Sequence, residues 1–191
     1  MTRKKYGRSR EPEKFIPHRC KMKYLTLSPN GDAGINTGFN LIGIGLTQHY
    51  EAVDDPTAFL PDGYTSYLQP SAPTYYGTES FTFPNHTTQK GKIDYIITAA
   101  VVNRATLIDD VSIQFHIWDA GFINIQSGTP IVGISVHPNW QSIGNLFFTN
   151  PAGTAWTWND IDSLIAGFSA SSTSLTALNV TQFCIMVHYC E

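Results

Sequence analysis

The chain has 191 residues, of which 42% are hydrophobic, 13% aromatic and 14% charged. A chain of this length can bury about 70% of its unfolded surface, which favours one domain with a substantial core. The high apolar content and the net charge of only -3 exclude disorder for most of the chain, and no run of about 18 apolar residues predicts a membrane span.

Basic residues are concentrated at the N-terminus. Residues 1–23 hold nine of the 12 basic side chains, namely Arg3, Lys4, Lys5, Arg8, Arg10, Lys14, Arg19, Lys21 and Lys23. Against Glu11 and Glu13 this segment carries +7, so residues 24–191 carry -10. Pro12 and Pro17 interrupt any long helix there. We therefore predict an extended basic arm over residues 1–23, followed by one domain over 24–191.

Three interpretations of the arm remain open. It could be an assembly arm that lies over an acidic neighbouring subunit, or it could neutralise the phosphates of packaged nucleic acid. A nuclear-localisation signal or contact with an anionic membrane is the third. Only Tyr6 and Phe15 provide aromatic rings in the arm, so base stacking is not indicated.

Alternating apolar residues separated by turn residues predict an all-β domain. The expected strands are Met22–Leu27, Phe39–Tyr50, Glu79–Phe83, Ile93–Asn103, Val111–Trp118, Phe122–Gln126, Pro130–Val136, Ser142–Thr149 and Val180–Tyr189. The proline-rich segment from Asp54 to Tyr76 is expected to be an ordered loop with one short strand near Thr65–Leu68. Ile93–Asn103 is apolar on both faces, as in a central strand of a sandwich. This spacing of strands is typical of an antiparallel β-sandwich.

One helix is expected near the C-terminus. Thr157 and Asp160 form a capping box, and a stripe of apolar residues follows from Ile161 to Phe168 at helical spacing. A Ser/Thr-rich loop is expected over 169–176.

No residue pattern indicates catalysis, a metal site or a cofactor. Cys20, Cys184 and Cys190 are too scattered for zinc. A Cys20–Cys190 cross-link is conceivable, although free thiols are the stronger expectation for a protein made in a reducing cytoplasm. His116 and His188 fall on the solvent side of their strands, where we expect structural roles. Glu79 and Asp94 are the only carboxylates in predicted strands, and neither has an evident partner for catalysis.

The four tryptophans offer a sugar-stacking alternative. Trp118, Trp140, Trp156 and Trp158 could form a platform in a lectin-like sandwich, with Trp140 or Trp118 the most plausible contacts. Core or interface packing is the more common use of such side chains.

Several segments resemble structural proteins of tailed bacteriophages and related viruses. They are LSPNGD at 27–32, HYEAVDDP at 49–56, NPAGTAWT at 150–157, DIDSLIAG at 160–167 and a final strand beginning VTQ at 180–182. Their order covers roughly residues 24–190. The resemblance implies a jelly-roll or concanavalin-like sandwich that serves as a virion component, with no catalytic residues. The arm departs from that pattern, because it precedes the point where such a domain would begin.

The sequence therefore predicts a non-enzymatic viral structural protein, made in the host cytoplasm and located in the virion. It is expected to assemble into or onto the particle through repeated subunit contacts, with an N-terminal arm that becomes ordered on assembly. Its expected partners are copies of itself and other virion proteins, such as a major capsid or tail protein, with no membrane partner. Two alternatives stay open. One is a small single-jelly-roll capsid protein whose basic arm binds packaged nucleic acid, and the other is a carbohydrate-binding β-sandwich module.

Overall fold

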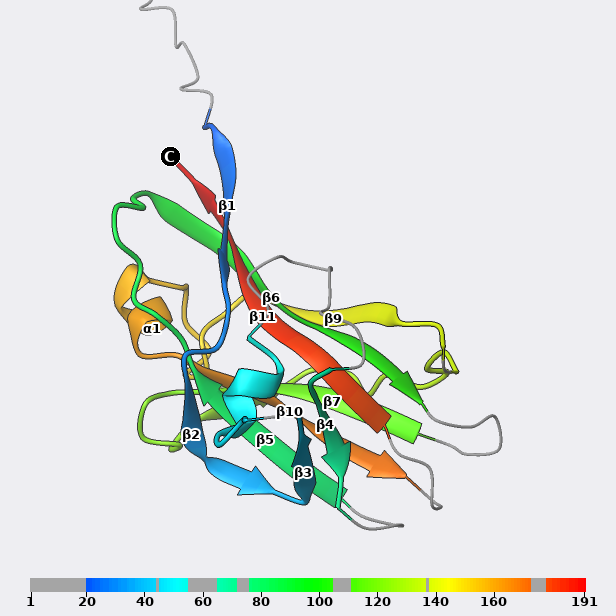
Figure 1. Cartoon of the computed structure of the whole chain (residues 1–191). Helices are drawn as coiled ribbons and strands as arrows, with labels where there is room; N and C mark the ends of the chain where they lie inside the picture. The colour runs from blue at the N-terminus through cyan, green and yellow to red at the C-terminus, as the bar shows by residue number, and fades with distance from the viewer. Residues whose placement is uncertain are drawn as a thin grey trace, which may run out of the picture.

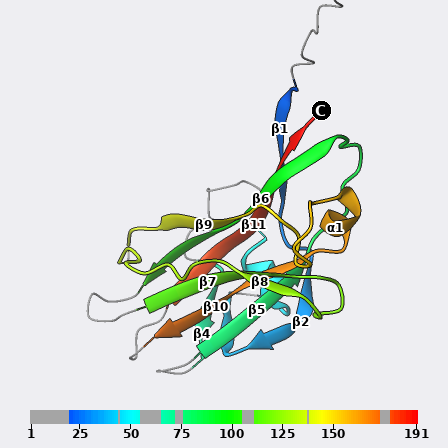
Figure 2. The ribbon, with the colours of Figure 1, turned by 180° about the vertical axis from the view of Figure 1, so that it is seen from behind.

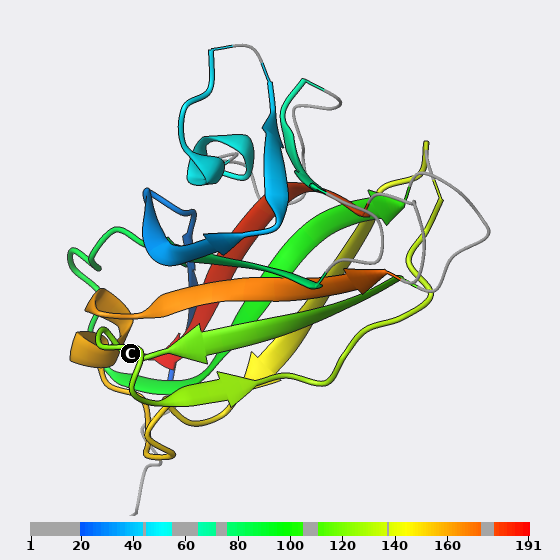
Figure 3. The same cartoon turned by 90° about the horizontal axis from the view of Figure 1, so that it is seen from below.

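The computed structural model describes residues 20–43, 45–54, 65–71, 76–104, 111–136, 138–172 and 178–191. Within them the chain is an all-β, jelly-roll-like sandwich of two antiparallel sheets, with six and five strands (Figure 1). Viewed from below, the two sheets lie one over the other (Figure 3). No helix in the described ranges has the length and hydropathy needed to cross a bilayer.

The six-stranded sheet is built around the C-terminal strand. Its order is β3 (Phe39–Ile42), β4 (Tyr67–Pro70), β11 (Leu178–Cys190), β6 (Lys92–Arg104) and β9 (Gln141–Phe147), and β1 (Met22–Leu27) also pairs with β11. β4 meets the start of β11 at Val180, whereas β1 pairs with its end from Ile185 onward. In consequence β1, the end of β11 and the start of β6 project beyond the rest of the sandwich (Figures 1 and 2).

The second sheet has five strands. Its order is β2 (Gly31–Thr37), β5 (Tyr76–Thr82), β10 (Ile165–Ser172), β7 (Val111–Trp118) and β8 (Ile125–Ser127). Two single-turn helices complete the described elements, a 3₁₀ turn η1 (His49–Ala52) and α1 (Trp158–Asp162).

Aromatic rings from both sheets fill the core. Phe81, Phe115 and Phe168 of the five-stranded sheet and Phe183 of β11 are fully buried. The Phe183 ring centroid lies 5.5 Å from that of Phe81 and 5.7 Å from that of Phe168. These distances fall in the range that favours edge and offset ring packing, so Phe183 ties the two sheets together.

Several predicted strands are confirmed with little change. Met22–Leu27 and Val111–Trp118 have the predicted bounds, and β6 and β11 extend their predictions by a few residues. Val111, Ile113, Phe115 and Ile117 all face the core, as their alternation predicted. β6 is a central strand, paired with β11 on one side and β9 on the other.

The helix is shorter than predicted. The capping box is present, with Thr157 Oγ1 accepting from the amide of Asp160, but the helix ends at Asp162. From Ile165 the chain forms β10, which also replaces the first part of the predicted Ser/Thr-rich loop. Strand pairing prevails because β10 lies between β5 and β7 and its backbone bonds to both. Ala166, Phe168 and Ala170 then alternate into the core.

Three other predictions need correction. The predicted strand Phe122–Gln126 begins only at Ile125, where β8 starts, because Phe122 adopts a positive φ of 55° in the preceding turn. The apolar run Phe39–Tyr50 is a strand only as far as Ile42, because Gly43 and Gly45 adopt positive φ angles of 155° and 80° and turn the chain towards η1. Pro130–Val136 forms isolated bridges at Ile131 and Val136 rather than a strand. β2 was not predicted, since Gly31–Thr37 carries little apolar alternation. Residues 55–64 and 72–75 of the predicted loop lie outside the described residues.

Candidate functional site

The outer face of the six-stranded sheet carries the most distinctive surface of the described chain. The pairing of β6 with β11 shifts register between His188 and Tyr189. Beyond this shift the even-numbered residues Ile96, Ala100 and Val102 of β6 face the core. The alternate residues of β6, including Tyr95, therefore face outward. Because β6 is apolar on both faces, the part of the outer face that β6 forms is largely apolar.

Four rings form a row across this face. Tyr24 of β1, His188 of β11, Tyr95 of β6 and Phe148 just after β9 make successive contacts, with centroid separations of 4.8, 4.4 and 5.8 Å. The middle pair stacks with an interplanar angle of 7°. Tyr24 and Phe148, at the two ends, are 62% and 67% exposed. We call these four residues the aromatic row.

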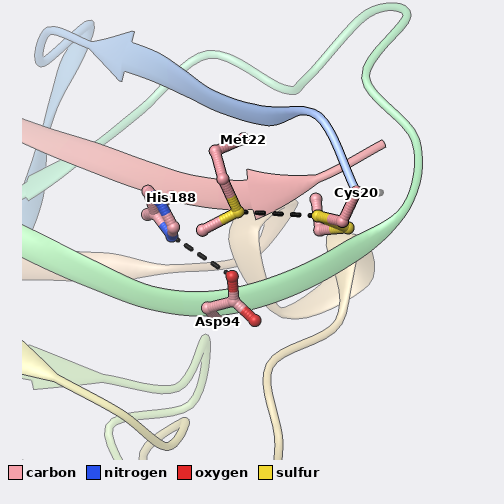
Figure 4. Close-up of a disulfide and its surroundings, with 5 residues drawn as sticks. Cys20, Met22, Asp94 and His188 are labelled. Carbon is pink, nitrogen blue, oxygen red and sulfur yellow. Dashed lines mark hydrogen bonds and ion pairs between the residues drawn. A yellow bond between two sulfur atoms is a disulfide. The ribbon is translucent and has the colours of Figure 1, made fainter. Parts of the chain in front are cut away.

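Polar contacts link members of the aromatic row to Asp94 and to one another. Nδ1 of His188 lies 3.2 Å from Oδ2 of Asp94, an ion pair if the ring is protonated (Figure 4). The side chains of Tyr24 and Tyr95 hydrogen-bond, and this contact is the largest cause that raises the pKa of Tyr95 above its usual value. The row is thus an ordered surface rather than a set of independent rings.

A shallow apolar hollow lies beside the aromatic row. Its volume is about 290 Å³, and it is lined by Ile97, Ala99, Ser142, Ile143, Gly144, Asn145, Leu146 and Met186. These residues come from β6, β9 and β11, and none of them is charged. Leu146 on the rim is 53% exposed. We call this feature the hollow.

A disulfide holds β1 against the end of β11. Cys20 and Cys190 are bonded, with Cα atoms 5.4 Å apart (Figure 4), a separation within the ordinary range for a disulfide. The backbones of Lys21 and Glu191 exchange two hydrogen bonds of 3.1 and 3.2 Å, and Lys23 Nζ forms an ion pair with Glu191 Oε2. The expectation of free thiols is therefore wrong for this pair. Cys184 is free and buried, and desolvation raises the pKa of its thiol to about 11.

The predicted arm residues fall on both sides of the first described residue. Lys21 and Lys23 lie beside the disulfide, and Met22 and Lys23 belong to β1. The others lie outside the described residues: Arg3, Lys4, Lys5, Arg8, Arg10, Lys14 and Arg19.

The tryptophans do not form a shared outer platform. Trp118 and Trp156 are each only 5% exposed, which corrects the idea of Trp118 as a sugar contact. Trp156 Nε1 donates to the carbonyl of Phe147, and Trp158 Nε1 donates to the carbonyl of Gly91. Core packing is thus confirmed as the role of Trp156. Trp118 is buried on the outer face of β7 instead, where its ring centroid lies 5.4 Å from that of His116 and 5.9 Å from that of Phe122.

The predicted structural histidines lie on outer faces, as their parity indicated, yet both are nearly buried. The ring nitrogens of His116 lie 2.8 and 2.7 Å from the hydroxyls of Ser127 and Ser169. Desolvation lowers the pKa of His116, so the ring is neutral at physiological pH. His188 is a member of the aromatic row, a role that its sequence position alone did not indicate.

Glu79 has an interaction partner that the sequence did not reveal. Its side chain is fully buried, with Oε2 2.9 Å from Nδ1 of His49 on η1. The Asp32 carboxylate accepts hydrogen bonds from the backbone amides of His49 and Tyr50 at 3.0 and 2.8 Å, and so anchors η1 nearby. Desolvation, with a contribution from Asp32, raises the pKa of Glu79 to about 9. The described residues contain no cluster of three or more His, Cys, Asp or Glu side chains placed to hold a metal ion.

Sequence reasoning missed the site as a whole. Parity showed that β6 is apolar on both faces, but pairing decides which strands lie beside it. The aromatic row joins residues 24, 95, 148 and 188, which no local motif connects. The strongest available signal was the second apolar face of Ile93–Asn103.

Comparison with known proteins gives no match to a family model and none to a curated protein sequence. Among solved structures, the CBM22-1 xylan-binding domain from Paenibacillus barcinonensis Xyn10C has a TM-score of 0.41 and 13% identity, over 85% of this chain and 92% of that one. A family 16 carbohydrate-binding module has a TM-score of 0.40 and 13% sequence identity, and the match covers 83% of this chain and 98% of that chain. The arabinose-bound MgGH51 α-L-arabinofuranosidase has a TM-score of 0.41 and 14% sequence identity, and the match covers 79% of this chain and 23% of that chain.

Proposed function

We propose that this chain is a non-enzymatic structural protein of a virus particle, which assembles with copies of itself and with other particle proteins. The observation that carries the proposal is the outer face of the six-stranded sheet. Tyr24, Leu146 and Phe148 there are each more than half exposed, and the neighbouring hollow is lined without charge. Interface cores are enriched in aromatic residues and methionine and depleted of charge, and exposed apolar patches mark such interfaces.

The distribution of charge supports the same proposal. Residues 1–23 carry +7 and residues 24–191 carry -10, so the basic segment of one copy is attracted to the body of another. The viral assignment rests on the resemblance of segments between residues 24 and 190 to structural proteins of tailed bacteriophages and related viruses. The particle is the proposed location. Because reducing cytoplasm disfavours disulfides, the Cys20–Cys190 bond would close after the chain leaves it.

Light scattering of the purified full chain tests assembly. We expect large homogeneous oligomers at about 50 mM salt that persist at about 500 mM salt, because apolar contacts are not screened by salt. The double variant Tyr24→Ser/Phe148→Ser should dissociate, whereas Val132→Ser, which removes an equally exposed apolar side chain elsewhere, should not. A monomer under all these conditions would contradict the proposal.

The same experiment with added single-stranded DNA decides the role of the basic segment. Assembly that requires DNA and fails at high salt would assign the segment to packaged nucleic acid, since phosphate contacts weaken steeply with salt. Assembly that is indifferent to DNA assigns it to attraction between protein copies.

A carbohydrate-binding module is the second candidate, and the open ends of the aromatic row favour it. The rings of Tyr24 and Phe148 are accessible to solvent, and Asp94 and His188 supply polar atoms close by. A sugar ring could stack its C–H groups on an aromatic face while its hydroxyls bond to these atoms. Electrophoresis in gels that contain soluble xylan, mannan or glucan tests this candidate. It predicts retardation of the wild type that Tyr24→Ser/Phe148→Ser abolishes and Val132→Ser retains.

A further inference from the structure

The loop between β7 and β8 presents an aliphatic side chain to solvent. Ile123 is 83% exposed, more than any other large hydrophobic side chain in the described ranges. Ile125, two residues later, is 53% exposed. A side chain as apolar as isoleucine gains free energy whenever a partner removes it from water.

Hydrogen bonds hold this loop, residues 119–124, in one conformation. The Asp119 carboxylate accepts from the amides of Ile123 and Asn124 at 2.8 and 3.2 Å and from the side-chain amide of Asn124 at 2.7 Å. Phe122 adopts a φ of 55°, in the left-handed region that non-glycine residues rarely occupy. Its ring lies 5.9 Å from that of Trp118. Such backbone strain persists only where surrounding contacts enforce it, so Ile123 is displayed by a preorganised loop.

The hollow has the complementary chemistry. Ala99 and Gly144, with their small or absent side chains, leave space between Ile97, Leu146 and Met186. The hollow opens on the outer face of the six-stranded sheet, whereas Ile123 lies in the loop that joins β7 and β8 of the five-stranded sheet. Because Ile123 is almost fully exposed, it does not fill the hollow of its own molecule.

We infer that Ile123 of one copy inserts into the hollow of the next copy. This inference rests on the proposed function, for which it supplies the contact between copies. The opposite charges of residues 1–23 and 24–191 favour a second copy as the occupant. Because the two complementary surfaces are different parts of the molecule, the contact is head-to-tail. Contacts of this kind generate rings when the rotation closes and filaments when it does not.

Two variants test the two sides of the contact. Ile123→Asp places a charge on the inserted side chain, and Leu146→Asp places one on the rim of the hollow. Val132→Asp is the matched control, because Val132 is 71% exposed and belongs to neither surface. All three positions are more than half exposed, so the variants should fold, which circular dichroism and thermal melting check. Each test variant should weaken self-association of the full chain at least about tenfold, and the control should leave it unchanged.

Mixing the two variants provides the sharper test. The Ile123→Asp chain keeps its hollow and the Leu146→Asp chain keeps its Ile123, so one intact contact can form between them. We expect a mixture of two monomeric variants to yield a one-to-one heterodimer and nothing larger. A contact between two identical surfaces would not be restored in this way.

The outcomes separate this inference from the proposed function. Wild-type assembly that Ile123→Asp leaves unchanged overturns the head-to-tail contact and leaves the structural role standing. Wild-type assembly that both variants abolish, without restoration on mixing, also overturns it. A monomeric wild type overturns both the contact and the proposed function.

Discussion

Glu79 is a carboxylic acid kept neutral inside the sandwich. It lies on the same inward face of β5 as Phe81, and its exposed fraction is zero. Its Oε1 has no hydrogen-bond partner among the described residues, while Oε2 contacts His49. An ionised carboxylate would be very unfavourable in this position, which is why the pKa rises from 4.5 to about 9. At neutral pH Glu79 is therefore a neutral carboxylic acid whose Oε2 faces Nδ1 of His49.

This raised pKa predicts a slope in stability. Between pH 4.5 and about 9 the unfolded chain loses the Glu79 proton while the folded chain retains it, so the stabilising contribution of the group is complete below pH 4.5 and is lost as pH rises towards 9. Glu79→Gln, which imitates the neutral acid, should flatten this decline. Urea unfolding of both proteins at several pH values in that interval measures the difference.

Glu51 provides the control with the opposite sign. The amides of Thr47 and Gln48 donate to its carboxylate and lower its pKa. Its contribution is therefore present above pH 4.5 and is lost as pH falls. Glu51→Gln should leave the slope above pH 4.5 intact, and parallel slopes for wild type and Glu79→Gln would refute the assignment of a neutral Glu79.

At the scale of elements, β1 depends on its attachment to β11. Its outward residues Met22 and Tyr24 are more than half exposed, and of its residues only Leu27 is buried. Pairing with a single neighbour and so little burial would leave the strand weakly held. The Cys20–Cys190 bond, which spans 170 residues, restrains the unfolded chain and fastens the strand at its outer end.

Removing this disulfide should lower the free energy of unfolding by about 2–5 kcal/mol. Denatured protein should offer one thiol to an alkylating reagent before reduction and three after it. Urea unfolding with and without reductant measures the loss, and Cys20→Ser/Cys190→Ser should show the lower stability without responding to reductant. Three reactive thiols in unreduced protein would show that the bond is absent.

Hydrophobic periodicity predicted correctly those elements in which pairing with neighbouring strands does not change the secondary structure that the local sequence favours. β7 alternates between core and surface, so periodicity located it and its inward face correctly. Ile165 and Phe168 fit a helical stripe equally well, and only the pairing of β10 with two neighbours decides for a strand. The aromatic row and the Glu79–His49 contact depend on residues brought together by topology, which a single sequence does not encode locally.

At the scale of the molecule, charge and apolar surface act over different distances. The +7 of residues 1–23 and the -10 of residues 24–191 attract copies from afar and are screened by salt within about 10 Å at 0.1 M. The outer face of the six-stranded sheet acts only on contact and does not depend on salt. Long-range attraction therefore governs how fast copies associate, and apolar contact governs how long they remain associated.

Deleting residues 1–19 separates these two effects, because Cys20 and β1 are retained. We expect the truncated chain to assemble more slowly at low salt, with little change in the rate at which oligomers dissociate. Raising the salt concentration should slow assembly of the full chain towards the rate of the truncated chain. Time-resolved light scattering after dilution from urea gives the association rate, and dilution of formed oligomers gives the dissociation rate. Oligomers of the truncated chain that fall apart much faster than those of the full chain would show instead that residues 1–19 form part of the bound interface.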